Sequence, residues 1–176
     1  YEYGEPFADY SMIPSYFLSK FASKYVKVAL GGDGGDELFA GYRTYNQGFR
    51  MQKWYNLRKI RPLLTPFNKS IKGNYLSGIM ELNSETIGSA LYRNIGFNDR
   101  DIDILTGSNE LSKIISNNRT SSIEEAKKHA ENPFDILLYA SIKTRLPNDY
   151  LVKTDRASMA NSLELRTPFL DKALIK

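Results

Sequence analysis

The sequence predicts an α/β domain built on a parallel sheet, to which this chain contributes mainly helices and one or few strands. Apolar residues recur at spacings of three and four through most of the chain, which is typical of amphipathic helices. A short β-branched run at residues 26–30 is bounded by glycine. A glycine-rich loop and another helical pattern follow it, the order found at the carboxyl edge of open parallel sheets.

The N-terminal third is expected to contain a helix, a strand, a loop and a second helix. Apolar side chains at positions 13, 16, 17, 21 and 25 lie on one helical face. Residues 26–30 predict a buried strand of a parallel sheet whose other strands lie outside this chain. Residues 38–45 predict a helix directly after the loop, and Pro62 and Pro66 interrupt any helix beyond it.

The second half is predicted to be mostly helical, because capping residues recur before apolar periodic segments. Ser84 is expected to cap a helix over residues 85–95, and Asn98 a short helix that ends at Gly107. The remaining expected helices cover residues 110–116, a charged segment from Ser121 or Ser122 to Ala130, a segment from the Asn132-Pro133 pair to residue 146, and residues 149–160.

Composition excludes several classes of protein. Of 176 residues, 41% are hydrophobic and 25% charged, which indicates a globular chain with a core rather than a disordered, collagen-like or coiled-coil chain. The absence of cysteine excludes disulfides, zinc–thiolate sites and cysteine nucleophiles from this segment. No apolar run approaches the roughly 18 residues that a membrane span needs, so no membrane partner is expected.

Charge is distributed unevenly along the chain. Residues 38–80 contain eight basic residues and no acidic one, so the rest of the chain is net negative. Aromatic residues lie among the basic ones, and a nucleic-acid surface is therefore an alternative function. We favour a solvated basic face, or one that docks an acidic neighbouring domain, because neither requires a further ligand.

The loop at residues 31–37 reads Gly-Gly-Asp-Gly-Gly-Asp-Glu. Four glycines let the backbone approach a ligand closely, and the N–H groups of the following helix suit phosphate. Asp33, Asp36 and Glu37 would repel bare phosphate, so the combination indicates Mg²⁺ between carboxylates and a polyphosphate. The simpler alternative is a turn in which one acid caps the helix, but a cap needs only one carboxylate and one glycine.

A second group of charges lies in residues 153–171. Arg156, Glu164 and Arg166 occur among small and apolar neighbours, so we expect them to be partly buried and paired. A guanidinium can bind a carboxylate through two parallel hydrogen bonds, which suits recognition of an amino acid. Pairing of Glu164 and Arg166 with other charges of the protein explains them equally well.

Several motifs occur in a fixed order along the chain. They are Glu-Pro-Phe-Ala-Asp at residues 5–9, Gly-Asp-Gly-Gly-Asp-Glu-Leu-Phe-Ala-Gly-Tyr at 32–42, Leu-Pro-Asn-Asp at 146–149, Asp-Arg-Ala-Ser-Met-Ala at 155–160, Ser-Leu-Glu at 162–164 and Arg-x-Pro-Phe-Leu-Asp at 166–171. Together they resemble the synthetase domain of glutamine-hydrolysing asparagine synthetases. The resemblance implies a parent domain of the ATP-pyrophosphatase type, an adenine nucleotide alpha-hydrolase-like α/β fold.

The same resemblance implies a reaction and the residues that serve it. ATP, with Mg²⁺, would adenylate the side-chain carboxylate of aspartate, and glutamine-derived ammonia would then displace AMP to give asparagine. Asp33 and Asp36 would be catalytic groups and metal ligands. The nucleotide would lie against Gly31, Gly32, Asp33, Gly34, Gly35 and Asp36, and the aspartate against Arg156, Glu164 and Arg166. Relatives often carry serine at the position of Gly31, so a hydroxyl contact there would be absent or supplied elsewhere.

Residues 1–176 would form only a central part of that domain. The family's Ser-Gly-Gly-x-Asp-Ser loop, its adenylation lysine and its glutaminase domain with an N-terminal cysteine are expected outside this sequence, so the isolated chain should be inactive. The resemblance further implies a cytoplasmic parent that carries the glutaminase domain in the same chain and could form a homodimer. Relatives that adenylate a surface-polysaccharide sugar acid or a β-lactam precursor are the alternative.

Overall fold

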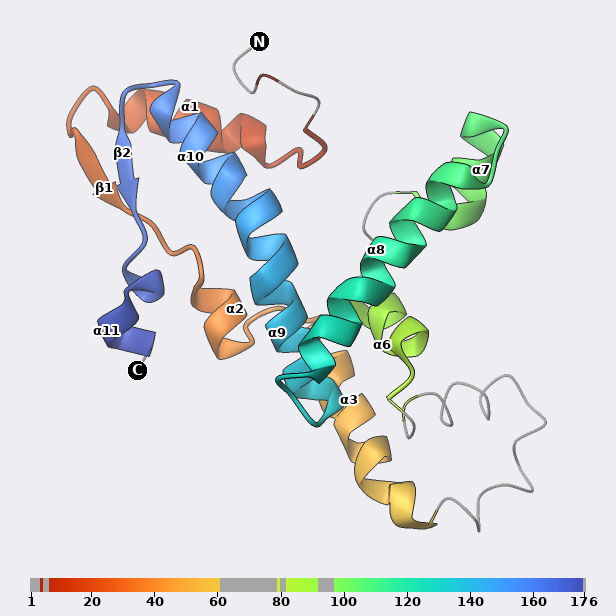
Figure 1. Ribbon diagram of the computed structural model, residues 1–176. Coiled ribbons are helices and arrows are strands. Elements are labelled where there is room, and N and C mark those ends of the chain that lie inside the picture. The colour runs from red at the N-terminus through yellow and green to blue at the C-terminus, as the bar shows by residue number, and fades with distance from the viewer. Residues whose placement is uncertain (1–3, 5–6, 61–78, 80–81, 92–96, 176) are drawn as a thin grey trace. The chain divides into compact units, whose positions relative to one another are not determined.

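The computed structural model describes residues 4, 7–60, 79, 82–91 and 97–175 (Figure 1). The chain divides into two compact units, one of Tyr1–Gly41 with Ile142–Lys176 and the other of Tyr42–Ser141. Helices predominate in both units, as predicted for this chain. Among the described residues, no helix combines the length and the apolar character needed to cross a bilayer.

The first unit contains the sheet and the helices around it. Its elements are α1 (Met12–Ala22), β1 (Val28–Leu30), α2 (Gly35–Phe39), the C-terminal part of α9 (Pro133–Arg145), a π-helical turn η3 (Leu146–Tyr150), α10 (Leu151–Met159), β2 (Glu164–Arg166), a 3₁₀ turn η4 (Pro168–Leu170) and α11 (Lys172–Ile175). Helix α10 packs along α1 and also contacts β2, an arrangement visible in Figure 1.

The two strands of the first unit pair in parallel, with Val28 opposite Glu164 and Leu30 opposite Arg166. The predicted strand is confirmed, but the expectation that all its partners lie outside this chain was wrong, because β2 pairs with it. Strand β2 was missed because its three residues include two charges and carry no β-branched pattern. The expected burial is also wrong, since Val28 is 42% exposed and Leu30 73% exposed.

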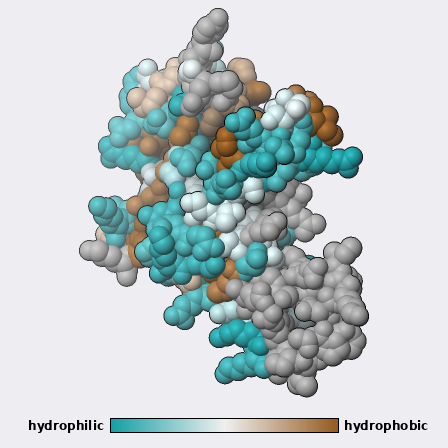
Figure 2. Space-filling view, turned by 45° about the vertical axis from the view of Figure 1, so that its right-hand side comes forward, coloured by the Kyte–Doolittle hydropathy of each residue, from teal (hydrophilic) through white to brown (hydrophobic). Residues whose placement is uncertain are grey.

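Apolar side chains lie on the surface of the first unit outside the strands as well. Phe17, Leu18 and Phe21 of α1 are exposed, and hydrophobic groups appear at the surface of the face that Figure 2 shows. Scattered apolar surface is normal in proteins, so these side chains by themselves identify no partner.

The segment after the glycine loop does not form one helix over residues 38–45. Helix α2 ends at Phe39, where Ala40 adopts a left-handed conformation with φ of 56°. The amide of Gly41 then donates to the carbonyl oxygen of Asp36 at 2.9 Å. Left-handed residues followed by glycine stop helices, so the apolar pattern continues across a turn. The next helix begins at Tyr45.

The second unit is helical and contains the main apolar core. Its helices are α3 (Tyr45–Asn56), the 3₁₀ turn η1 (Leu57–Ile60), α6 (Ser84–Leu91), α7 (Asp99–Thr106), α8 (Glu110–Lys127) and the N-terminal part of α9. The buried cluster comprises Met51, Ile79, Ile87, Leu91, Ile123, Ala126, Ile136, Leu137 and Ala140. Their side chains are removed from water, which is the main force that holds such helices together.

Local capping signals were read correctly at two helices. The side-chain oxygen of Asn98 accepts from the amide of Asp101 at 3.0 Å, and α7 ends at Gly107 with φ of 66°. The side-chain oxygen of Asn132 accepts from the amide of Asp135 at 3.0 Å at the start of α9. Helix α10 confirms the helix expected over residues 149–160.

Two predictions in the second unit were wrong. Residues 110–127 form one helix rather than two, because Ser122 donates to the carbonyl of Arg119 within the helix instead of capping a new one. Ser84 does not cap α6, since the amide of Thr86 donates to the side chain of Asn83 at 3.1 Å. The predicted positions 92–95 and the prolines 62 and 66 lie outside the described residues.

Candidate functional site

The glycine-rich loop, residues 31–37, lies at the carboxyl end of β1 and leads into α2. The amide of Gly31 donates to the carbonyl of Arg166 at 2.8 Å, so the carboxyl end of β2 lies at the same edge of the sheet. The predicted order of strand, loop and helix is therefore confirmed. Ligands of parallel α/β sheets bind at this edge, and the loop is the candidate site of the chain.

Two glycines of the loop lie against the turn η4. Gly34 has φ of +89°, and a Cβ atom there would lie 2.3 Å from Cδ2 of Leu170. A Cβ on Gly35 would lie 3.3 Å from the ring of Phe169. The same ring packs edge to face against Phe39 of α2, with 5.9 Å between the ring centroids. These glycines are needed for packing and backbone conformation, whatever ligand the loop binds.

The two preceding glycines differ from each other. A Cβ on Gly31 would lie 3.0 Å from Leu165 of β2, whereas a Cβ on Gly32 would meet no atom within 4 Å. Packing explains the glycine at position 31, but it does not explain the one at position 32. A glycine without neighbours leaves its backbone accessible to a ligand, so Gly32 is the best candidate in the loop for such an approach.

Asp33 and Asp36 lie beside different segments outside the loop. The hydroxyl of Thr154, on α10, donates to Oδ1 of Asp33 at 3.3 Å. Oδ1 of Asp36 lies so close to Gly41 that a Cβ there would be 1.9 Å away. The two carboxylates thus adjoin different segments of the first unit, and each has two oxygens that can accept from or coordinate a ligand.

Glu37 was counted among the acids of the loop, but the sequence assigned it no binding or catalytic role. Glu37 is only 2% exposed, and its Oε1 atom has no hydrogen-bond partner among the described residues. A buried carboxylate oxygen without a partner is energetically unfavourable, so such groups are often retained for function. The only signal in the sequence was its position next to Asp36, because burial depends on contacts that a local pattern does not report.

A partly buried ion pair joins Lys153, near the start of α10, to Asp9 ahead of α1. Nζ of Lys153 lies 3.0 Å from Oδ2 of Asp9 and 2.9 Å from the hydroxyl of Ser11. Burial alone would raise the pKa of Asp9, but hydrogen bonds from Ser11 and Lys153 outweigh it and lower that pKa. Burial, together with the nearby charge of Asp9, raises the pKa of Asp149. Asp9 and Asp149, one from each of two motifs, therefore both lie near Lys153, which directly precedes Thr154.

The residues expected on the substrate side are only partly brought together. Nε of Arg166 lies 2.8 Å from Oε1 of Glu164, so these two side chains pair with each other on β2. The expectation that they are partly buried was wrong, since their side chains are 65% and 54% exposed respectively. Arg156 lies on α10 and is half-buried, as expected.

The donor set of the loop fits Mg²⁺ bound together with phosphate. Among the residues that the structure describes, no three His, Cys, Asp or Glu side chains gather in a group that could hold a metal ion by themselves. Mg²⁺ usually binds one or two carboxylates and completes its shell with water and substrate phosphates. Asp33 and Asp36 can supply that number of carboxylates.

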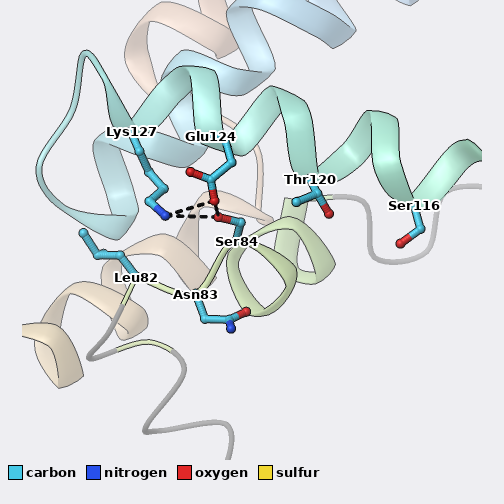
Figure 3. A pocket seen from close by; sticks show the side chains of 7 residues that line it. All are labelled: Leu82, Asn83, Ser84, Ser116, Thr120, Glu124 and Lys127. Atoms are coloured by element: carbon cyan, nitrogen blue, oxygen red, sulfur yellow. Dashed lines mark hydrogen bonds and ion pairs between the residues drawn. The ribbon is translucent and has the colours of Figure 1, made fainter. Parts of the chain in front are cut away.

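A separate hollow of about 580 Å³ lies between α6 and α8 in the second unit (Figure 3). The residues that line it are mostly polar: Leu82, Asn83, Ser84, Ser116, Thr120, Glu124 and Lys127. Nζ of Lys127 donates to Glu124 at 3.1 Å and to Ser84 at 3.2 Å, and Ser84 donates to Glu124. Because its charged groups already satisfy one another, we assign no ligand to this hollow.

The asparagine synthase family model matches residues 1–176. Asparagine synthetase [glutamine-hydrolyzing] 1 of Bacillus subtilis is 31% identical over 187 residues, which cover 99% of this chain and 28% of that protein. A putative asparagine synthetase [glutamine-hydrolyzing] of Mycobacterium tuberculosis H37Rv is 32% identical over 178 residues, covering 95% of this chain and 26% of that protein.

Another relative matches a shorter part of the chain. The putative asparagine synthetase [glutamine-hydrolyzing] 2 of Methanocaldococcus jannaschii is 45% identical over 74 residues, covering 40% of this chain and 14% of that protein. No solved structure matches this chain significantly. The chain spans 26–28% of the length of the relatives that match nearly all of it. Because the family model covers every residue, the chain belongs to the asparagine synthase family.

Proposed function

We propose that this chain forms the part of an ATP-dependent, glutamine-hydrolysing asparagine synthetase that holds the phosphates of ATP. The observation that carries the proposal is the loop at residues 31–37. It presents Asp33, Asp36 and an unhindered Gly32 at the carboxyl edge of two parallel strands. Membership of the family and the names of the relatives support the same activity.

The proposed reaction has two steps. The side-chain carboxylate of aspartate attacks the α-phosphorus of ATP, which gives β-aspartyl-AMP and pyrophosphate. Ammonia from glutamine then attacks the activated carbonyl, and AMP leaves as asparagine forms. Enzymes promote displacement at phosphorus mainly by positioning the reactants and by placing opposite charge near the phosphate oxygens. The residues of this chain would therefore act chiefly by binding and positioning the substrates.

In this scheme the loop binds the nucleotide through backbone and carboxylates. Gly31, Gly32, Gly34 and Gly35 keep the backbone close to the phosphates, and Asp33 and Asp36 hold Mg²⁺. When bound, Mg²⁺ would offset the negative charge of the phosphates beside these carboxylates. The support for these roles is that both acids lie in the loop at the carboxyl end of β1 and that a Cβ on Gly32 would meet no atom within 4 Å.

Arg156, Glu164 and Arg166 are proposed to bind aspartate. The best supported of them is Arg166, because its carbonyl accepts from Gly31 and its residue therefore adjoins the loop. Its guanidinium is paired with Glu164 in an exposed position, where such a pair is weak and can exchange for a substrate carboxylate. A bidentate carboxylate contact would then replace the pair.

The remaining proposals concern the parent protein. We propose that residues 1–176 are a central part of a synthetase domain with the α/β fold of ATP pyrophosphatases. A glutaminase domain of the same chain would deliver the ammonia. A cytoplasmic location and a homodimer are consistent with this assignment, and the length of the relatives supports a parent much longer than this chain.

The test is aspartate-dependent exchange between ATP and pyrophosphate in the complete parent protein. Asp36→Asn should abolish exchange while circular dichroism stays unchanged, because a neutral amide is a poor ligand for Mg²⁺. Asp101→Asn, an equally small change on α7, is the control and should retain exchange. Exchange supported by another carboxylic acid but not by aspartate would contradict the substrate assignment, and unchanged Mg²⁺ dependence in Asp36→Asn would contradict the metal role.

A further inference from the structure

Helix α10 is tied to three separate segments of the first unit. Lys153 bonds to Asp9 and Ser11 ahead of α1, and Thr154 bonds to Asp33 of the loop. Just after the helix, the side-chain nitrogen Nδ2 of Asn161 donates to the carbonyl of Tyr16 in α1 at 3.3 Å. Ala157 and Ser158 of α10 are fully buried. A helix held at so many points is a rigid base from which a side chain can orient a mobile group.

The hydroxyl of Thr154 has one proton and two acceptors within reach. It lies 2.9 Å from the carbonyl oxygen of Tyr150, one helical turn earlier, and 3.3 Å from Oδ1 of Asp33. An ionised carboxylate only accepts hydrogen bonds, so this proton is shared between the carbonyl and Asp33. The bond orients the carboxylate without using its second oxygen, Oδ2, which stays available for a cation.

The hydrogen bond from Thr154 joins α10 to an acid of the loop. We propose that Thr154 is a positioning residue that fixes the orientation of the Asp33 carboxylate for binding Mg²⁺ and phosphate. The role of the bond in catalysis rests on the proposed function, whereas the bond itself can be tested without any activity. Without the hydroxyl, Asp33 would sample other rotamers and would have to be ordered when the ligand binds.

The chain offers a matched set of variants. Thr154→Val keeps the shape of the side chain and removes the hydroxyl, and Thr154→Ser keeps the hydroxyl. Thr106 on α7 is the control, because its hydroxyl also lies 2.8 Å from the carbonyl oxygen one turn earlier, that of Ile102, while its second acceptor is the carbonyl oxygen of Ser108 at 2.8 Å rather than a carboxylate. Thr106→Val therefore reports the effect of losing such a bond within a helix, away from the loop.

In the complete parent protein, Thr154→Val should lower kcat/KM for Mg-ATP about tenfold in the exchange assay, since hydrogen bonds to charged groups are the stronger kind. The apparent Mg²⁺ requirement should rise with it. Thr154→Ser should stay within about threefold of wild type, and Thr106→Val should not differ from wild type. Equal losses in Thr154→Val and Thr154→Ser would overturn the proposal, because the methyl group rather than the hydroxyl would then matter.

Amide hydrogen exchange of residues 31–37 provides the readout that needs no activity. Thr154→Val should speed exchange in the loop, and adding it to Asp33→Ala should produce no further change, because the acceptor is already gone. The proposal would be overturned if Thr154→Val sped amide exchange equally in wild type and in Asp33→Ala. It would also be overturned if the loop of Thr154→Val exchanged its amide hydrogens as fast as the wild-type loop does. If the wild-type parent showed no aspartate-dependent exchange between ATP and pyrophosphate, the proposed function would be refuted. Amide hydrogen exchange would still decide whether Thr154 orients Asp33.

Discussion

Replacing Gly34 by alanine should destabilise the loop by about 2–5 kcal/mol. Two effects contribute. The residue has φ of +89°, a left-handed conformation that an L-residue adopts at a cost of roughly 1–2 kcal/mol. The new methyl carbon would lie 2.3 Å from Cδ2 and 2.7 Å from Cγ of Leu170, and such overpacking typically costs about 1–3 kcal/mol.

Gly107→Ala separates the two effects. Gly107 ends α7 with φ of +66°, and no atom lies within 4 Å of a Cβ placed there. This variant therefore pays only the conformational term of roughly 1–2 kcal/mol. Urea unfolding of the parent gives the free energies of unfolding, and amide exchange of residues 31–42 and 99–110 gives the local ones. The difference between the variants measures the clash with Leu170.

Equal destabilisation by Gly34→Ala and Gly107→Ala would refute the assignment of the clash, because it would show that Leu170 moves away freely. Adding Leu170→Ala to Gly34→Ala gives an independent check. The double variant should regain part of the stability lost in Gly34→Ala, since the methyl carbon would then enter space that Leu170 had filled. If the second substitution only adds its own loss, the two side chains do not compete for that space.

Three further variants test other contacts. Gly32→Ala should unfold at the same urea concentration as wild type yet bind a fluorescent ATP analogue more weakly, because the new side chain meets only the ligand; unchanged binding would exclude a close approach at Gly32. Asp9→Asn should lower stability at pH 7, because ionised Asp9 accepts stabilising hydrogen bonds in the folded state. The difference from wild type should shrink as the pH falls below about 4, the pKa of an unperturbed Asp, and should vanish only below the lowered pKa of folded Asp9; a difference independent of pH would contradict this. Asn98→Ala should speed amide exchange in α7 by the equivalent of about 0.5–2 kcal/mol, and unaltered exchange would show that its cap is dispensable.

The elements that could be predicted from sequence are those stabilised by neighbours along the chain. Asn98 and Asn132 cap helices through amides three residues later, and both caps were recognised. The loop between β1 and α2 was located because its glycines and acids are consecutive. Its roles in binding Mg²⁺ and ATP remain predictions, which the variants above test.

Predictions failed where a distant partner changed the outcome. Ser84 has the composition of a cap, but its hydroxyl donates to Glu124 of another helix, and Asn83 caps α6 instead. Strand β2 forms because Glu164 and its two successors meet β1, not because they favour extended structure. In both cases the sequence shows the chemical character of the side chains, but it does not show which distant residue each one contacts.

The sequence by itself determined where α7 and α9 start, where the glycine-rich loop lies and which motifs link the chain to its family, because each depends on residues close together along the backbone. Only the tertiary structure decided that Glu37 is buried, that Thr154 reaches Asp33 and that Leu170 occupies the space beside Gly34. These contacts join residues more than a hundred positions apart, or depend on everything packed around one side chain. Local sequence patterns do not identify such contacts, since these depend on how the elements pack against one another.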